Sequence, residues 1–188
     1  MDATTMAAAC ASTRQVIDQI SDADLDRPTP CRDWTVRQLL NHLIGTLQLG
    51  RALLEDTAPE AAMGPGELPD ADLVGGDPAK AYRLGAEALL AAAQPDTLAR
   101  MHATPLGDMP GAILGGFTTL DIAVHGWDLA TAIGRPLALD DALARDILAF
   151  ANQTINDDTR APRLGPAIAV DDTAPLTDRL VAYLGRTP

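Results

Sequence analysis

The segment from Pro110 to Gly134 constrains the fold of this chain more than any other. Its apolar residues recur at helical spacing, Gly134 stands where a helix would end, and Pro136 follows. We therefore predict one long helix that starts near Pro110. One face of it carries Leu114, Phe117, Asp121, His125, Asp128 and Ala132. Three polar residues interrupt this otherwise apolar face, and such a pattern calls for a chemical reason.

A second long helix is predicted after Thr35. Thr35 and Gln38 match the capping box, in which each side chain bonds the backbone N–H of the other residue. Trp34 is placed to pack on Leu39 as a hydrophobic staple. Two apolar stripes follow at spacings of three and four, and His42 lies in one of them. A helix that is apolar on two sides is expected at the centre of a bundle, so His42 should point into packed structure.

The rest of the chain also favours helices. Amphipathic patterns predict them over about 4–20, 78–94, 140–151 and 176–184, and loops over 95–109 and 152–166. Residues 56–77 are rich in proline, glycine and acidic residues, and they predict a long surface crossover that lets the third helix run parallel to the second. Aromatic residues make up only 3% of the 188 residues, while alanine and leucine dominate. We predict an all-α fold in a single domain over 1–188.

The charge of the chain limits its partners. A net charge of -12 disfavours binding to nucleic acid and to anionic membranes. No apolar run approaches the roughly 20 residues that span a bilayer. The N-terminus has no basic region of the kind that opens a secretory signal, so we expect a cytoplasmic protein. Its two cysteines, Cys10 and Cys31, are expected to be reduced thiols.

Asp121 and His125 form a candidate metal site. They stand four residues apart, so their side chains lie one helical turn apart on one face. If the two long helices face each other, His42 joins them to give two imidazoles and one carboxylate. This set suits zinc, nickel or ferrous iron and leaves positions for water and substrate. The alternative is a structural polar pair, in which Asp121 accepts a hydrogen bond from His125 or from an arginine.

Four other residues have side chains with possible chemical roles, and their sequence contexts differ. Asp128 is an orienting or substrate-facing group, or equally a surface aspartate. Cys31 lies before the second helix, where a thiolate is favoured, although a loop thiol without function is the simpler interpretation. Cys10 fits a buried position in an apolar stripe. His102 is predicted to be a loop or surface histidine.

The chain resembles a known family in three runs that occur in this order: TPCRDWTVRQLLNHLIG, DIAVHGWDLATAIGRPL and LTDRLVAYLGR. They are similar to actinobacterial metal-binding proteins related to the N-terminal domain of mycothiol-dependent maleylpyruvate isomerase, in the DinB-like superfamily. The resemblance implies a four-helix bundle of up-down-down-up order with a long crossover and short extra helices. It also implies a divalent metal, zinc foremost, held by His42, Asp121 and His125. A homodimer is a further expectation from the superfamily.

The resemblance implies a function class but no substrate. Its members point to a metal-dependent transferase or isomerase, in which a thiol such as mycothiol attacks a small electrophile. Two departures argue against maleylpyruvate itself: the isomerase has glutamate where Asp121 stands, and the chain leaves no room for the isomerase's C-terminal domain. The alternative is a non-catalytic metal-binding bundle that serves as a ligand- or partner-binding module. A fourth protein ligand, such as Asp128 or His102, would favour that alternative.

Overall fold

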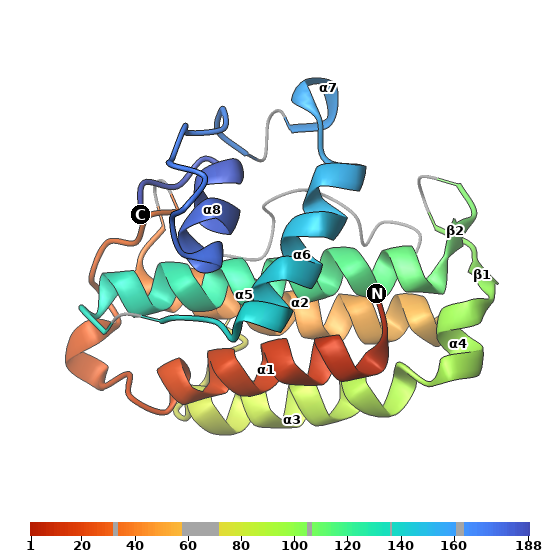
Figure 1. Cartoon of the computed structure of the whole chain (residues 1–188). Coiled ribbons are helices and arrows are strands. Elements are labelled where there is room, and N and C mark those ends of the chain that lie inside the picture. The colour runs from red at the N-terminus through yellow and green to blue at the C-terminus, as the bar shows by residue number, and fades with distance from the viewer. Residues whose placement is uncertain (32–33, 58–71, 105–106, 136, 161–163) are drawn as a thin grey trace. The chain divides into compact units, whose positions relative to one another are not determined.

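Helices dominate the computed structural model of this chain (Figure 1), which describes residues 1–31, 34–57, 72–104, 107–135, 137–160 and 164–188. Within these ranges the only sheet has two strands of two residues each, so the predicted all-α class is confirmed. The contacts define two compact units, Met1–Leu137 and Ala138–Pro188. The prediction of a single domain over 1–188 stays a prediction. No helix among the described residues has the length and apolar character needed to cross a membrane.

Four long helices make the bundle of the first unit. Its elements are α1 (Ala3–Ile17), η1 (Asp22–Asp24), α2 (Val36–Leu54), α3 (Pro78–Ala92), α4 (Pro95–Ala99), β1 (Met101–His102), β2 (Met109–Pro110) and α5 (Gly111–Ala132). Helix α2 packs between α3 and α5, and α1 packs on the same two helices from the other side. In Figure 1, α1 and α5 run in one direction while α2 and α3 run in the other. This is the predicted up-down-down-up order.

Helix α2 begins where its sequence predicts. The Thr35 N–H donates to Gln38 Oε1 at 3.0 Å, and the Gln38 N–H donates to Thr35 Oγ1 at 3.4 Å, which completes the capping box. The apolar residues Leu39, Leu40, Leu43 and Leu47 of the helix are fully buried, while the stripe that contains His42 is partly exposed. Because α3 and α5 cover two sides of α2, a polar residue on the side toward α5 needs a polar partner there.

Helix α5 lies close to α1 beside the predicted site residues. Gly126 faces Thr13 of α1 so closely that a Cβ atom at this position would overlap the Thr13 side chain. The Thr13 hydroxyl donates to the Ile122 carbonyl at 2.9 Å, and this buried hydrogen bond joins the two helices. The glycine next to His125 therefore sets how near α1 comes to the centre of α5.

The crossover between α2 and α3 falls largely outside the described residues, since 58–71 are not among them. Most residues of its described end, 72–77, are exposed as predicted, but this end is anchored at Val74. The buried Asn41 side chain of α2 accepts hydrogen bonds from the Leu73 and Val74 N–H groups at 2.9 and 3.0 Å, and Val74 is buried. A side-chain amide thus satisfies backbone groups that would otherwise be buried without partners.

His102 is buried, so its predicted position on the surface is wrong. It lies in β1, which pairs antiparallel with β2. Its ring nitrogens lie 2.8 Å from Asp56 Oδ1 and 2.9 Å from the Thr97 carbonyl oxygen. Arg100 also binds Asp56. The hairpin thus lies against the end of α2. The sequence did not show this burial, because a strand of two residues is too short to have a detectable period.

The second unit contains α6 (Asp141–Thr154), α7 (Asp157–Arg160) and α8 (Leu176–Tyr183). Asp140 caps α6 as predicted, and α6 packs on α8 with its apolar face buried. The predicted loop over 152–166 is partly wrong, because α6 continues to Thr154 and α7 follows. The Asn156 side chain accepts from the Asp158 and Thr159 N–H groups at 3.0 Å and so starts that short helix.

Candidate metal centre

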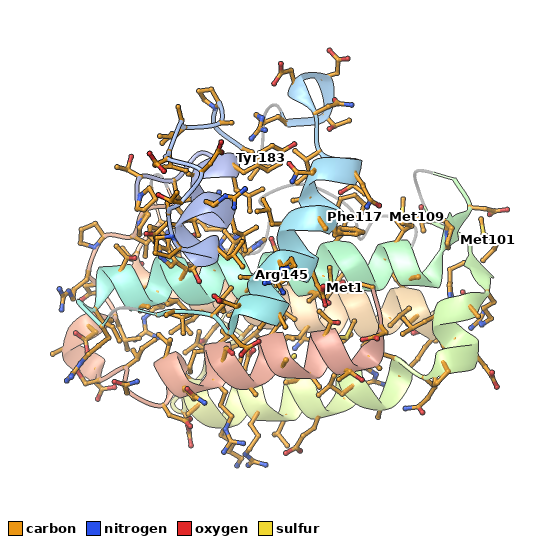
Figure 2. The ribbon with its side chains drawn as sticks, in the orientation of Figure 1. Met1, Met101, Met109, Phe117, Arg145 and Tyr183 are labelled. Atoms are coloured by element: carbon orange, nitrogen blue, oxygen red, sulfur yellow. The ribbon has the colours of Figure 1, made fainter. Side chains whose placement is uncertain are left out.

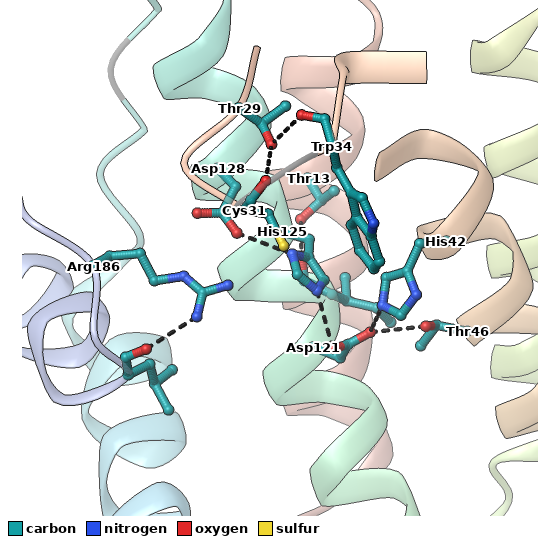
Figure 3. Close-up of polar contacts among 12 residues, drawn as sticks. Thr13, Thr29, Cys31, Trp34, His42, Thr46, Asp121, His125, Asp128 and Arg186 are labelled. Carbon is teal, nitrogen blue, oxygen red and sulfur yellow. Dashed lines mark hydrogen bonds and ion pairs between the residues drawn. The ribbon is translucent and has the colours of Figure 1, made fainter. Parts of the chain in front are cut away.

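His42, Asp121 and His125 meet between α2 and α5 (Figure 3). His42 Nε2 lies 3.2 Å from Asp121 Oδ2, and His125 Nε2 lies 3.2 Å from Asp121 Oδ1. The two imidazole rings stand edge to face, with centroids 4.9 Å apart. The sequence prediction that these three side chains face one another is therefore matched by their geometry.

The donor set is of the kind that binds a divalent cation. Two imidazole nitrogens and one carboxylate are ligands that zinc accepts, and three ligands leave a coordination position open. Two atoms that each bind a tetrahedral zinc at about 2.0 Å lie about 3.3 Å apart. The two nitrogen-to-oxygen distances of 3.2 Å are close to that separation. The two distances involve different oxygens of Asp121, and one ligand atom from each of the three residues lies within 4.8 Å of the others, so a single cation requires the side chains to close around it.

The open side of the site lies at His42 and Asp121. Their side chains are 22% and 31% exposed, whereas that of His125 is 8% exposed. The Thr46 hydroxyl, one turn after His42, donates to Asp121 Oδ2 at 2.8 Å. Desolvation would raise the pKa of Asp121, but the charge of His125 and hydrogen bonds from both imidazoles hold the pKa well below its ordinary value. Asp121 is thus an anion.

Asp128 orients His125 from behind. Its Oδ2 lies 3.0 Å from His125 Nδ1, and the Asp128 side chain is fully buried. The interpretation of Asp128 as a surface aspartate is therefore wrong. Desolvation lowers the pKa of His125, but Asp121 and Asp128 outweigh it and raise this pKa to about 9. A carboxylate on Nδ1 leaves Nε2 directed at the site, as in many metal-binding histidines.

Trp34 forms an aromatic wall that the sequence analysis did not assign to the site. Its ring centroid lies 4.8 Å from that of His42 and 6.3 Å from that of His125. The Thr29 N–H and hydroxyl both donate to the Trp34 carbonyl oxygen, at 3.1 and 2.9 Å, and hold the backbone in place. Periodicity could not have found this contact, because Trp34 precedes the first turn of α2.

The two cysteines have different surroundings. Cys31 is half-buried, and its sulfur belongs to a second group of possible ligand atoms, with His125 and Asp128. Cys10 is buried in α1 as predicted, and burial raises the pKa of its thiol to about 11. The Cys10 thiol is therefore neutral at physiological pH, and Cys31 is the thiol that lies beside the candidate site.

Comparison with known families identifies the relatives of this bundle. The family described as the mycothiol maleylpyruvate isomerase N-terminal domain matches residues 6–130. The chain belongs to this family. The match includes His42, Asp121, His125 and Asp128, and it ends two residues before the end of α5. Membership confirms the family expected from the three sequence runs.

Two proteins of Mycobacterium tuberculosis are similar to this chain over most of their length. The uncharacterized proteins MT0763, of strain CDC 1551 / Oshkosh, and Rv0738, of strain ATCC 25618 / H37Rv, are each 34% identical over 168 residues. The match covers 87% of this chain and 85% of each relative. No solved structure matches the chain significantly. The family is thus established, while the names of these relatives carry no activity.

Proposed function

We propose that this member of the mycothiol maleylpyruvate isomerase N-terminal domain family binds one divalent cation, zinc foremost with nickel or iron as alternatives, at His42, Asp121 and His125. We further propose that it is a thiol S-transferase or isomerase acting on a small electrophile. The observation that carries the proposal is the convergence of two imidazole nitrogens on one carboxylate, each at 3.2 Å, on a partly exposed side of the bundle.

The residues around the cation would divide the work. A divalent cation in this site would lower the pKa of a thiol and polarise a carbonyl group. Asp128 keeps the proton on His125 Nδ1 and directs Nε2 into the site, and the Thr46 hydroxyl steadies Asp121. Trp34 excludes water from one side of His42. The thiol sulfur would form a bond to an electrophilic carbon while its proton passes to solvent and the leaving group takes the electron pair.

The position of the neighbouring residues supports an enzyme over a binding module. Asp128 bonds the far nitrogen of His125, and His102 bonds Asp56 and Thr97. Neither of these two predicted candidates for a fourth ligand belongs to the group of His42, Asp121 and His125. A coordination position left for a small molecule is typical of catalytic sites. Family membership supports mycothiol as the thiol, since the family is named for it.

The test combines metal analysis with a thiol-transfer assay. Purified wild type is expected to hold about one zinc, nickel or iron per chain and to couple mycothiol to monochlorobimane, with chloride released. Asp121→Asn should lose both the metal and the activity, because it removes the only carboxylate of the set. Asp96→Asn, an exposed aspartate of α4, is the matched control. Metal-free wild type after reconstitution would refute the metal site, while bound metal without any thiol transfer would favour the binding module.

A further inference from the structure

A second group of ligand atoms lies on the other edge of the His125 ring. The Cys31 sulfur, a His125 ring nitrogen and an Asp128 carboxylate oxygen all lie within 4.8 Å of one another. In Figure 3 the sulfur lies beside the ring on the edge that faces Asp128, while Asp121 lies at the opposite edge. One imidazole therefore stands between two sets of ligand atoms of different chemistry.

We propose that Cys31, His125 and Asp128 form a second cation site for a thiophilic divalent ion, held by the cysteine sulfur, His125 Nδ1 and an Asp128 oxygen. A set with sulfur and imidazole selects zinc, cobalt or cadmium, whereas magnesium and calcium prefer oxygen ligands. The first set contains no sulfur. This site goes beyond the proposed function and does not require His42 or Asp121.

The surroundings of the three side chains define how an ion would enter. Asp128 is fully buried and His125 nearly so, while Cys31 is half-buried and forms the accessible side. Sulfur and nitrogen ligands of one tetrahedral zinc lie about 3.5 Å apart. The three ligand atoms here lie within 4.8 Å of one another, so a closure of little more than about an ångström at most brings them to an ion. Each set already holds a close pair: His125 Nδ1 and Asp128 Oδ2 lie 3.0 Å apart in this set, and the nitrogen-to-oxygen pairs of the first set lie 3.2 Å apart.

Charge and protons balance in this site. The ion replaces the proton on His125 Nδ1 and the proton of the Cys31 thiol, and both protons pass to solvent. When the first site is also filled, the His125 ring has lost both of its protons and bridges the two ions as an imidazolate. A thiolate and a carboxylate then neutralise the two positive charges of the ion. Because Asp128 exchanges its hydrogen bond with Nδ1 for the ion, filling this site also loosens the support of His125 in the first set.

A nucleophilic relay of cysteine, histidine and aspartate fits the geometry less well. In such a relay the carboxylate orients one ring nitrogen and the thiol bonds the other. Here Asp128 lies 3.0 Å from Nδ1 and Asp121 lies 3.2 Å from Nε2, so carboxylates face both nitrogens. The Cys31 sulfur lies on the same edge of the His125 ring as Asp128, which is the arrangement expected of two ligands of one ion.

Cobalt titration of metal-free protein tests this site, because sulfur bound to Co²⁺ gives a charge-transfer absorption in the near ultraviolet that nitrogen and oxygen ligands do not. Wild type is expected to show this band as the second equivalent of cobalt binds. A variant that combines His42→Ala with Asp121→Asn should keep the band. Cys31→Ser should lose it, while Cys10→Ser, the matched control, should keep it.

Two outcomes would overturn the second site: a band that survives Cys31→Ser, or a band that disappears when only His42 and Asp121 are replaced. Should Cys31→Ser fail to fold, alkylation of Cys31 in the His42→Ala, Asp121→Asn variant replaces it, and Cd²⁺ is expected to slow that reaction at least about tenfold. An unchanged rate would refute the site. Failure of the first metal site, on which the proposed function rests, gives a different result. Cobalt would then bind only at the site that contains Cys31.

Discussion

The two histidines of the candidate site are supported in opposite ways. His125 is nearly buried, and the carboxylate of Asp128 holds its far nitrogen by a charged hydrogen bond. His42 is more exposed, and its ring is flanked by the rings of Trp34 and His125. Charged hydrogen bonds fix an orientation more strongly than ring contacts do. His125 is therefore the fixed side of the site, and His42 is the more exposed and adjustable side.

Replacement of His125 is expected to have the largest effect on metal affinity. His125→Ala removes a ligand at the fixed side and should weaken zinc binding by more than about 100-fold, the upper range for loss of a supporting partner. His42→Ala should weaken zinc binding less, because the buried ligand His125, which Asp128 orients, stays in place. Competition with a chromogenic chelator measures both affinities. Equal losses would show that the two sides do not differ.

Asp128→Asn tests how much the support of His125 by Asp128 contributes to zinc affinity, because it leaves the three ligands of the ion unchanged. The amide keeps the size of the side chain but loses the charge that orients His125, so zinc affinity should fall by about 10–100-fold. Asp96→Asn serves as the surface control, and the same chelator competition applies. An affinity within about twofold of wild type would mean that packing alone orients the ring.

The affinity of the site for metal is expected to rise with pH. In the metal-free protein desolvation lowers the pKa of His125, but Asp121 and Asp128 raise it to about 9, so its ring is protonated at neutral pH. A cation at Nε2 must displace that proton. Each pH unit below about 9 should therefore change the affinity about tenfold, with tighter binding at higher pH. Calorimetry in buffers of different ionisation enthalpy counts the released proton, and binding without proton release would contradict this assignment.

Trp34→Ala is expected to act mainly on the adjustable side. Loss of the ring beside His42 should weaken zinc binding by less than about tenfold, a smaller loss than for Asp128→Asn. The thiol-transfer rate should change more than the affinity, because water then reaches His42. Trp34→Phe retains an aromatic ring and should stay near wild type in both assays. A loss of metal as large as that of His125→Ala would make Trp34 part of the fixed side.

His102 provides the contrast of a histidine outside the site. His102→Ala should leave zinc affinity unchanged but lower the free energy of unfolding by about 1–3 kcal/mol, because the buried ring and its contacts with Asp56 and the Thr97 carbonyl are lost. Urea denaturation of the metal-free protein measures the stability. Reduced zinc affinity in a folded variant would show that the site extends to the hairpin.

Much of the fold could be predicted because its signals are local. The capping box of Thr35 and Gln38 and the cap at Asp140 mark helix starts within a few residues, and they hold in the structure. The meeting of His42 with Asp121 and His125 was also predictable, since each lies on a face that must be buried against another helix. The family runs added the order in which the helices pack.

The parts that sequence analysis missed depend on contacts between segments without a period. Trp34 reaches His42 from a loop, and helical spacing does not show that the Thr46 hydroxyl bonds Asp121. His102 is buried by a hairpin whose strands have two residues each. Side-chain directions in loops and very short strands are set by tertiary packing, which helical spacing does not encode.

The bond between His42 and Asp121 joins residues 79 positions apart in the chain. Unfolding must separate these two residues, so an ion that both of them hold would bind the native state and not the unfolded chain. Such a ligand adds about 2.7 kcal/mol of stability at a concentration 100 times its dissociation constant. The melting temperature of the bundle is therefore a direct readout of occupancy, and candidate metals and thiols can be ranked by thermal shift before any reaction is known.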